Sequence, residues 1–134
     1  MPLDPELESI SGATELHDWF GYWPTFHDAV ILKFQINQES KSFLVIHAWE
    51  MTKEVDAHGY YKLTKHVVVD FILQKIQKVE VMDLFDRGII FSLAIKKINN
   101  TFNFDISSSY GLNGTIEAED VEIRMTPGEP LPRD

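Results

Sequence analysis

Two adjacent His-Asp pairs, His17-Asp18 and His27-Asp28, are the residues of this sequence that best suit acid–base chemistry. General acid–base catalysis uses a histidine whose second ring nitrogen is held by a carboxylate. Neighbouring residues of a strand point to opposite faces, so His27 and Asp28 can act together only where a strand begins irregularly. We therefore favour a structural role, in which Asp28 accepts backbone N–H groups after Pro24 and His27 bonds a neighbouring strand. A small hydrolase or metal-binding enzyme that uses His27 and Asp28 is the alternative.

Other standard sites are missing from the sequence. The five histidines have neither His-x-x-x-His nor His-x-His spacing, and the chain has no cysteine. No Gly-x-Ser-x-Gly elbow and no glycine-rich phosphate loop occurs. We therefore predict no catalytic residue, no metal site and no cofactor, and a protein that is not an enzyme.

The charge of the chain suggests the kind of partner it would have. The sequence has 21 acidic and 12 basic residues and a net charge of −9. This balance argues against nucleic-acid and anionic membrane partners, whose phosphates need basic side chains, and it suits a basic protein. No base interrupts residues 115–123, which contain Glu117, Glu119, Asp120 and Glu122. These acids predict either a solvated or guarded sheet edge or a patch that steers a basic partner.

A second candidate contact surface lies near the end of the predicted strand 42–52, where a predicted loop over 53–60 begins. It is a further acidic patch of Glu50, Glu54 and Asp56, and the candidate exposed aromatic residues are Trp23, Trp49, Tyr60 and Tyr61. Exposed aromatic side chains are the usual anchors of protein interfaces.

Local signals predict one or two short helices before residue 24. Asp4 followed by Pro5 and Glu6 suits a single helical turn. A second helix runs from a Thr14 cap to Gly21, with an apolar face of Leu16, Trp19 and Phe20.

After Pro24 the apolar period changes to two, which is typical of strands. We predict strands over 28–37, 42–52, 65–73, 74–81, 89–97, 101–107 and 115–125, of which 74–81 is a separate strand or the continuation of 65–73 round a bend. The inward residues would be Val30, Leu32, Phe34 and Ile36, then Ile89, Phe91, Leu93 and Ile95, then Phe102, Phe104 and Ile106. Asn99-Asn100 would be a tight turn, and 83–88 a further turn. The inward phase of the last strand slips near Glu119 and Asp120, which predicts a β-bulge there.

The expected fold class is α+β, mainly antiparallel β. About seven strands form a meander, as a curved sheet, half-barrel or sandwich, behind the short N-terminal helices. Residues 1–126 would form a single globular domain and 127–134 an extended, proline-rich tail. No apolar run approaches the roughly 20 residues of a membrane span. The first residues lack the basic and apolar regions of a signal peptide, which favours the cytoplasm.

One segment resembles a known family. Trp23-Pro24-Thr25-Phe26-His27-Asp28-Ala29-Val30 is similar to the W-P-x-F-H-D-A-E-[VI] opening of the immunity protein 50 family of bacterial polymorphic toxin systems. The likeness continues in His66-Val67, in 79–90 and in 110–121, and covers about residues 16–126. Val30 stands where the family has Glu, and Asp86-Arg87-Gly88-Ile89 replaces its N-x-Q-N element.

The resemblance implies a non-enzymatic, cytosolic antidote that binds and neutralises a cognate toxin, for example a basic nuclease. It implies that Trp23, Phe26, His27 and Asp28 fix the first strand rather than contact the toxin. Toxin contact would fall on acidic and aromatic surface residues. A third hypothesis is an accessory domain that acts by self-association, which an exposed edge at residues 67–73 would favour.

Overall fold

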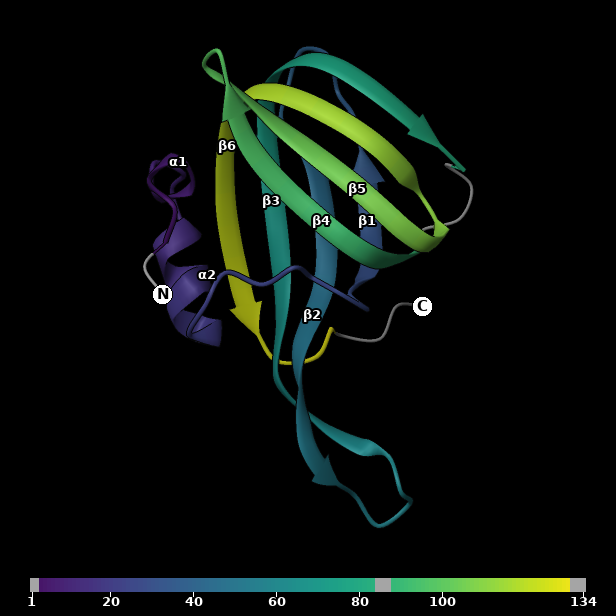
Figure 1. Cartoon of the computed structure of the whole chain (residues 1–134). Coiled ribbons are helices and arrows are strands. Elements are labelled where there is room, and N and C mark those ends of the chain that lie inside the picture. The colour runs from purple at the N-terminus through teal and green to yellow at the C-terminus, as the bar shows by residue number, and fades with distance from the viewer. Residues whose placement is uncertain (1–2, 84–87, 131–134) are drawn as a thin grey trace.

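The computed structural model describes residues 3–83 and 88–130 (Figure 1). Two short helices precede six antiparallel strands in this part of the chain. The elements are α1 (Pro5–Glu8), α2 (Ala13–Phe20), β1 (Val30–Gln35), β2 (Ser42–Val55), β3 (Tyr61–Met82), β4 (Gly88–Ile98), β5 (Thr101–Gly111) and β6 (Asn113–Pro127). The mainly antiparallel α+β class is confirmed.

The sheet closes into a barrel with the strand order β1-β2-β3-β6-β5-β4. Closure depends on a short pairing of β1 with β4, at Val30 and Ile89. Strand β3 lies between β2 and β6, so residues 67–73 are paired on both sides and not on an exposed edge. This pairing argues against the self-association hypothesis.

The predicted strands 65–73 and 74–81 form one strand, β3, so the described residues contain six strands and not seven. Lys75 has a left-handed backbone (φ 56°) and bends β3 without ending its pairing with β6. The inward phase of β6 does change, because Ile116, Ala118 and Ile123 are all buried. The predicted bulge at Glu119 and Asp120 is nevertheless wrong, since the register shift lies in β3, between Ile76 and Lys78.

Helix α1 begins as predicted, with the Asp4 carboxylate accepting the Glu6 N–H at 2.9 Å. The N-cap of helix α2 is Gly12 and not the predicted Thr14. Gly12 has φ 90°, and a Cβ there would lie 1.9 Å from the carbonyl oxygen of Ile123 in β6. This close approach brings the start of α2 against the edge of β6 (Figure 1). Gly21 ends the helix in the left-handed region, as expected.

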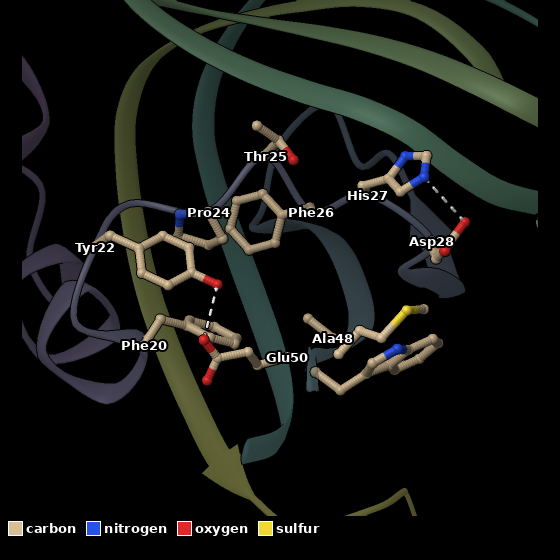
Figure 2. Close-up of a pocket in the computed structure, with 11 residues that line it drawn as sticks. Phe20, Tyr22, Pro24, Thr25, Phe26, His27, Asp28, Ala48 and Glu50 are labelled. Atoms are coloured by element: carbon tan, nitrogen blue, oxygen red, sulfur yellow. Dashed lines mark hydrogen bonds and ion pairs between the residues drawn. The ribbon is translucent and has the colours of Figure 1, made fainter. Parts of the chain in front are cut away.

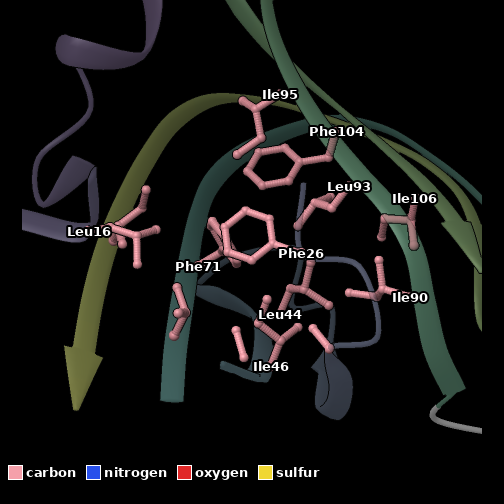
Figure 3. Packing of buried hydrophobic residues seen from close by; sticks show 14 of the residues in the cluster. Leu16, Phe26, Leu44, Ile46, Phe71, Ile90, Leu93, Ile95, Phe104 and Ile106 are labelled. Atoms are coloured by element: carbon pink, nitrogen blue, oxygen red, sulfur yellow. The ribbon is translucent and has the colours of Figure 1, made fainter. Parts of the chain in front are cut away.

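The barrel interior is filled by apolar side chains (Figure 3). Phe71 lies edge-on to both Phe26 and Phe104, with ring centroids 5.8 and 5.6 Å away. The predicted inward set of β5, namely Phe102, Phe104 and Ile106, is buried as expected.

The predicted inward faces of β1 and β4 are only partly right, since Leu93 and Ile95 are buried and Phe34 packs against the core, but other residues differ. In β4 Ile90 is fully buried, whereas Ile89 and Phe91 are 40% and 55% exposed. In β1 Ile31 is the fully buried residue. The cause is the same in both strands, because register shifts interrupt the pairing of β4 with β5 and of β1 with β2. One extra residue reverses the face of everything beyond it.

Strands β2 and β3 continue past the barrel as a projecting two-stranded hairpin, residues 50–64, which we call the arm (Figure 1). The first three residues of the predicted loop 53–60 therefore belong to β2, and the connection shrinks to a turn from Asp56 to Tyr60. The Asp56 carboxylate accepts the N–H groups of His58 and Tyr60 at 2.8 and 3.0 Å, which fixes this turn.

Some predicted segments fall at the limits of the described chain. Strand β6 runs to Pro127, and the Gly128 N–H donates to the His66 carbonyl at 2.7 Å. The remainder of the predicted tail, 131–134, and most of the predicted turn 83–88 lie outside the described residues. Within 3–83 and 88–130, no helix has the length and apolar character needed to cross a membrane.

Candidate functional site

The segment that leads into β1 has a strained backbone. Phe26 and Asp28 lie in the left-handed region, with φ 62° and 68°. This conformation costs a non-glycine residue about 1–2 kcal/mol. Hydrogen bonds to β4 oppose the cost: the Asp28 N–H donates to the Ile90 carbonyl at 2.8 Å, and the Leu93 N–H donates to the Thr25 carbonyl at 2.9 Å. Strain that the surrounding structure maintains in this way is typical of functional sites.

The strain brings His27 and Asp28 together at an irregular strand start. His27 Nε2 lies 3.5 Å from Asp28 Oδ1, and the side chains are 55% and 41% exposed. His27 Nδ1 is 3.0 Å from the Phe91 carbonyl oxygen. Because a carbonyl only accepts, Nδ1 carries the hydrogen of this contact, and Nε2 is the ring nitrogen that faces Asp28.

One of the two contacts predicted for this pair is found. His27 does bond a neighbouring strand, β4. The contact found for the Asp28 carboxylate in the described part of the chain is His27, and not the backbone N–H groups that we expected.

A pocket of about 240 Å³ opens beside this pair (Figure 2). It is lined by residues of three segments, namely Phe20 and Tyr22, residues 24–28, and residues 48–51 of β2. Trp49 and Glu50, predicted as partner contacts, line it together with Phe26, His27 and Asp28, predicted as structural. Figure 2 shows Glu50 at one end of the pocket and His27 with Asp28 at the other. Trp23 packs half-buried against Phe26, with ring centroids 6.0 Å apart, which agrees with a structural role.

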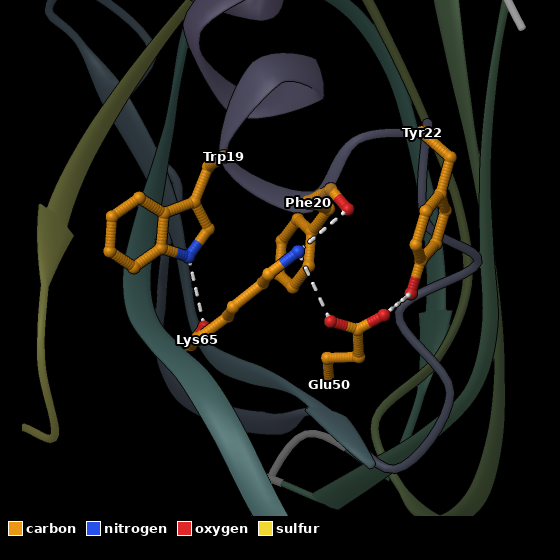
Figure 4. A network of polar contacts seen from close by, with 5 residues as sticks. All are labelled: Trp19, Phe20, Tyr22, Glu50 and Lys65. Atoms are coloured by element: carbon orange, nitrogen blue, oxygen red, sulfur yellow. Dashed lines mark hydrogen bonds and ion pairs between the residues drawn. The ribbon is translucent and has the colours of Figure 1, made fainter. Parts of the chain in front are cut away.

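A polar network holds one end of this pocket (Figure 4). Lys65 Nζ lies 3.2 Å from Glu50 Oε2 and donates to the Phe20 carbonyl at 3.1 Å. The Trp19 indole N–H donates to the Lys65 carbonyl at 2.9 Å. The Tyr22 hydroxyl donates to Glu50 Oε1 at 3.4 Å, and burial together with Glu50 raises the pKa of that hydroxyl. The network ties the end of α2 to the base of the arm and places a lysine beside Glu50.

The arm exposes a row of apolar side chains next to the pocket. Met51 is paired with Leu63, and Val55 with Tyr61. Paired residues share a face, and Tyr61 and Leu63 are two apart on one strand, so all four side chains lie on one face. They are 41–58% exposed, and Met51 also lines the pocket. The arm face, defined by these four residues, is therefore continuous with the pocket.

Sequence reasoning placed Val55 in a loop and did not assign Met51 or Leu63 to a contact surface. The alternation of Tyr61 and Leu63, read as a strand ahead of residue 65, was the available signal.

The acidic residues of β6 lie elsewhere on the barrel. Glu119 and Asp120 are exposed, and Glu117 and Glu122 are half-buried. Asp120 is 3.5 Å from Lys75, and Glu122 is 2.8 Å from Arg124. Strand β3 separates these acids from β2, and basic neighbours balance part of their charge. They do not belong to the pocket.

A histidine pair sits outside the barrel on β2 and β3. His47 Nε2 and His66 Nδ1 are 3.1 Å apart, and the Trp49 ring lies 4.8 Å from that of His47. Burial, helped by His66 and opposed by Glu129, lowers the pKa of His47. Among residues 3–83 and 88–130, no group of three or more histidine and carboxylate side chains is placed to hold a metal ion.

Comparisons with known protein families, with curated proteins and with solved structures found no match. The features of this protein that bear on its function are therefore the pocket, the arm and the charge of the chain.

Proposed function

We propose that this protein is a non-enzymatic immunity protein that binds and neutralises a cognate bacterial toxin in the cytoplasm. The partner would be a basic protein, such as a nuclease. Its docking surface would be the pocket together with the arm face. The resemblance of Trp23–Asp28 to the immunity protein 50 family supports this choice over other binding functions.

The observation that carries the proposal is the continuity of the arm face with the pocket. A two-stranded hairpin is marginally stable by itself. Four large apolar side chains exposed on one face of such a hairpin are typical of a protein interaction site. Tyrosine, tryptophan and methionine are enriched in the cores of protein interfaces, and all three occur here. The net charge of −9 would speed encounter with a basic partner.

Co-expression with the protein encoded beside this one tests the proposal. We expect the neighbour to arrest growth alone, to be silenced by this chain, and to be captured with it in a salt-sensitive complex. The double variant Met51→Ser/Leu63→Ser should weaken that complex by about thirtyfold or more, as for interface hot spots.

A matched double variant controls for the loss of exposed apolar surface. Met82 and Ile98 are 64% and 53% exposed and lie outside the arm, so Met82→Ser/Ile98→Ser should bind like the wild type. Equal binding by both double variants, or failure to capture the neighbour at all, would contradict the proposal.

One observation favours a second candidate, a small hydrolase. His27 is not buried against apolar neighbours, since its Nε2 faces an open pocket beside Asp28 while Nδ1 is fixed by the Phe91 carbonyl. This is a geometry in which a histidine can act as a general base. Hydrolysis of an activated ester or phosphodiester that is lost in His27→Gln would support this candidate, and equal background rates would exclude it for those substrates.

A further inference from the structure

We infer that the pocket takes an arginine side chain of the bound partner, with the guanidinium against the Asp28 carboxylate and the aromatic rings of the pocket. The inference rests on the proposed function and names the group that the pocket recognises. Its first support is size. The volume of about 240 Å³ lies below the roughly 300–1,000 Å³ of pockets for drug-sized ligands. A single long side chain is a better match to it than a whole cofactor.

The charge of the pocket favours a cation. Of the two carboxylates that line it, Glu50 already has the Lys65 ammonium at 3.2 Å. Asp28 has no lysine or arginine within ion-pair distance in the described part of the chain. Its contact there is His27 Nε2 at 3.5 Å, so no permanently charged cation faces this carboxylate. A guanidinium presents its donors in a fixed fork that matches a carboxylate.

The walls of the pocket favour arginine over lysine. The rings of Phe20, Tyr22, Phe26 and Trp49 line it. Arginine is less strongly hydrated than lysine and stacks on aromatic rings. It therefore loses less hydration free energy than lysine when it enters such a pocket. Met51 belongs to both the pocket and the arm face, so a partner lying along the arm would be within reach of the pocket.

N-acetyl-L-arginine amide is the probe, titrated into the full chain and followed by two-dimensional NMR of the backbone amides and the Trp49 indole. The lysine and norleucine amides serve as comparison ligands. We expect saturable shifts confined to the pocket, tighter binding of the arginine amide than of the lysine amide, and no binding of the norleucine amide. Shifts that fail to saturate, or that fall outside the pocket, would overturn the inference.

Asp28→Asn is the decisive variant, because asparagine has the same shape and tolerates the left-handed backbone of this position. It should weaken the binding of the arginine amide by about tenfold or more, which is the loss of affinity expected when a hydrogen bond to a charged group is removed. Asp120→Asn is the control, since that carboxylate is exposed on β6 beside Lys75. Equal weakening in both variants, or in neither, would overturn the inference.

The same variant separates this inference from the proposed function. If the toxin is captured and Asp28→Asn binds it as the wild type does, the arginine site is wrong and the proposed function stands. If the arginine amide binds at Asp28 and no toxin is captured, the arginine site is supported and the proposed function is wrong.

Discussion

The face of β4 that points into the barrel can be tested with two neighbouring residues. A strict period of two places Phe91 inside with Leu93 and Ile95, whereas the structure places Ile90 inside and Phe91 outside. If Phe91 points inward, Phe91→Ala should be the less stable variant. If Ile90 points inward, Ile90→Ala should be the less stable variant. The pair also bears on the site, because the Phe91 carbonyl accepts the hydrogen bond from His27.

The size of each effect follows from burial. Ile90 is 0% exposed, and Ile90→Ala removes three carbon atoms at about 0.8 kcal/mol each before any cavity is counted. We expect a loss of about 3 kcal/mol in the free energy of unfolding. Phe91 is 55% exposed, and water can fill the space that its ring leaves, so Phe91→Ala should cost about 1 kcal/mol or less.

Urea unfolding of both variants, followed by tryptophan fluorescence and circular dichroism, measures the difference. With an unchanged slope m, the midpoint should fall clearly for Ile90→Ala and little for Phe91→Ala. A larger loss for Phe91→Ala than for Ile90→Ala would refute the bulged register of β4.

Three further predictions concern pH and backbone geometry. Burial, helped by His66, lowers the pKa of His47, so the unfolded chain binds a proton at this histidine more tightly than the folded chain does. The free energy of unfolding should therefore fall as the pH drops below 6.5. Urea midpoints measured over a pH series should show a shallower fall for His47→Gln than for the wild type. Burial raises the pKa of Asp70 despite nearby basic side chains, so the folded state gains stability as the pH falls through that raised pKa. Asp70→Asn should accordingly raise the urea midpoint at neutral pH, and an unchanged or lower midpoint would contradict this. Gly12→Ala should cost about 3 kcal/mol in urea unfolding, because its Cβ would lie 1.9 Å from a carbonyl oxygen of β6. Gly21→Ala, with a similar φ and nothing within 4 Å, should cost only about 1–2 kcal/mol, and equal losses would contradict the docking of α2 on β6.

Features that depend on residues a few positions apart were predictable from the sequence. The Asp4 cap, the Gly21 helix end and the inward face of β5 all follow from local chemistry. Asn99 and Asn100, both left-handed in the structure, form the expected two-residue turn between β4 and β5. These patterns were enough for the fold class and for most strand positions.

The burial of Ile31 in β1 and of Ile90 in β4 was beyond the sequence, because a bulge depends on the strand that lies opposite. Closure of the barrel was equally out of reach, since it depends on a pairing between Val30 and Ile89, which are far apart in the chain. The arm was hidden because its strands are stabilised by pairing with each other and not by a buried face.

The sequence by itself determined which residues are available to form the site, and the tertiary structure decided how these residues are arranged. It identified Trp49 and Glu50 as surface contacts, whereas it assigned His27 and Asp28 a structural role, with acid–base chemistry as the alternative. Left-handed backbones at Phe26 and Asp28, maintained by long-range hydrogen bonds to β4, brought the two groups into one pocket. Local preferences oppose such a backbone, so only the packed barrel could produce it.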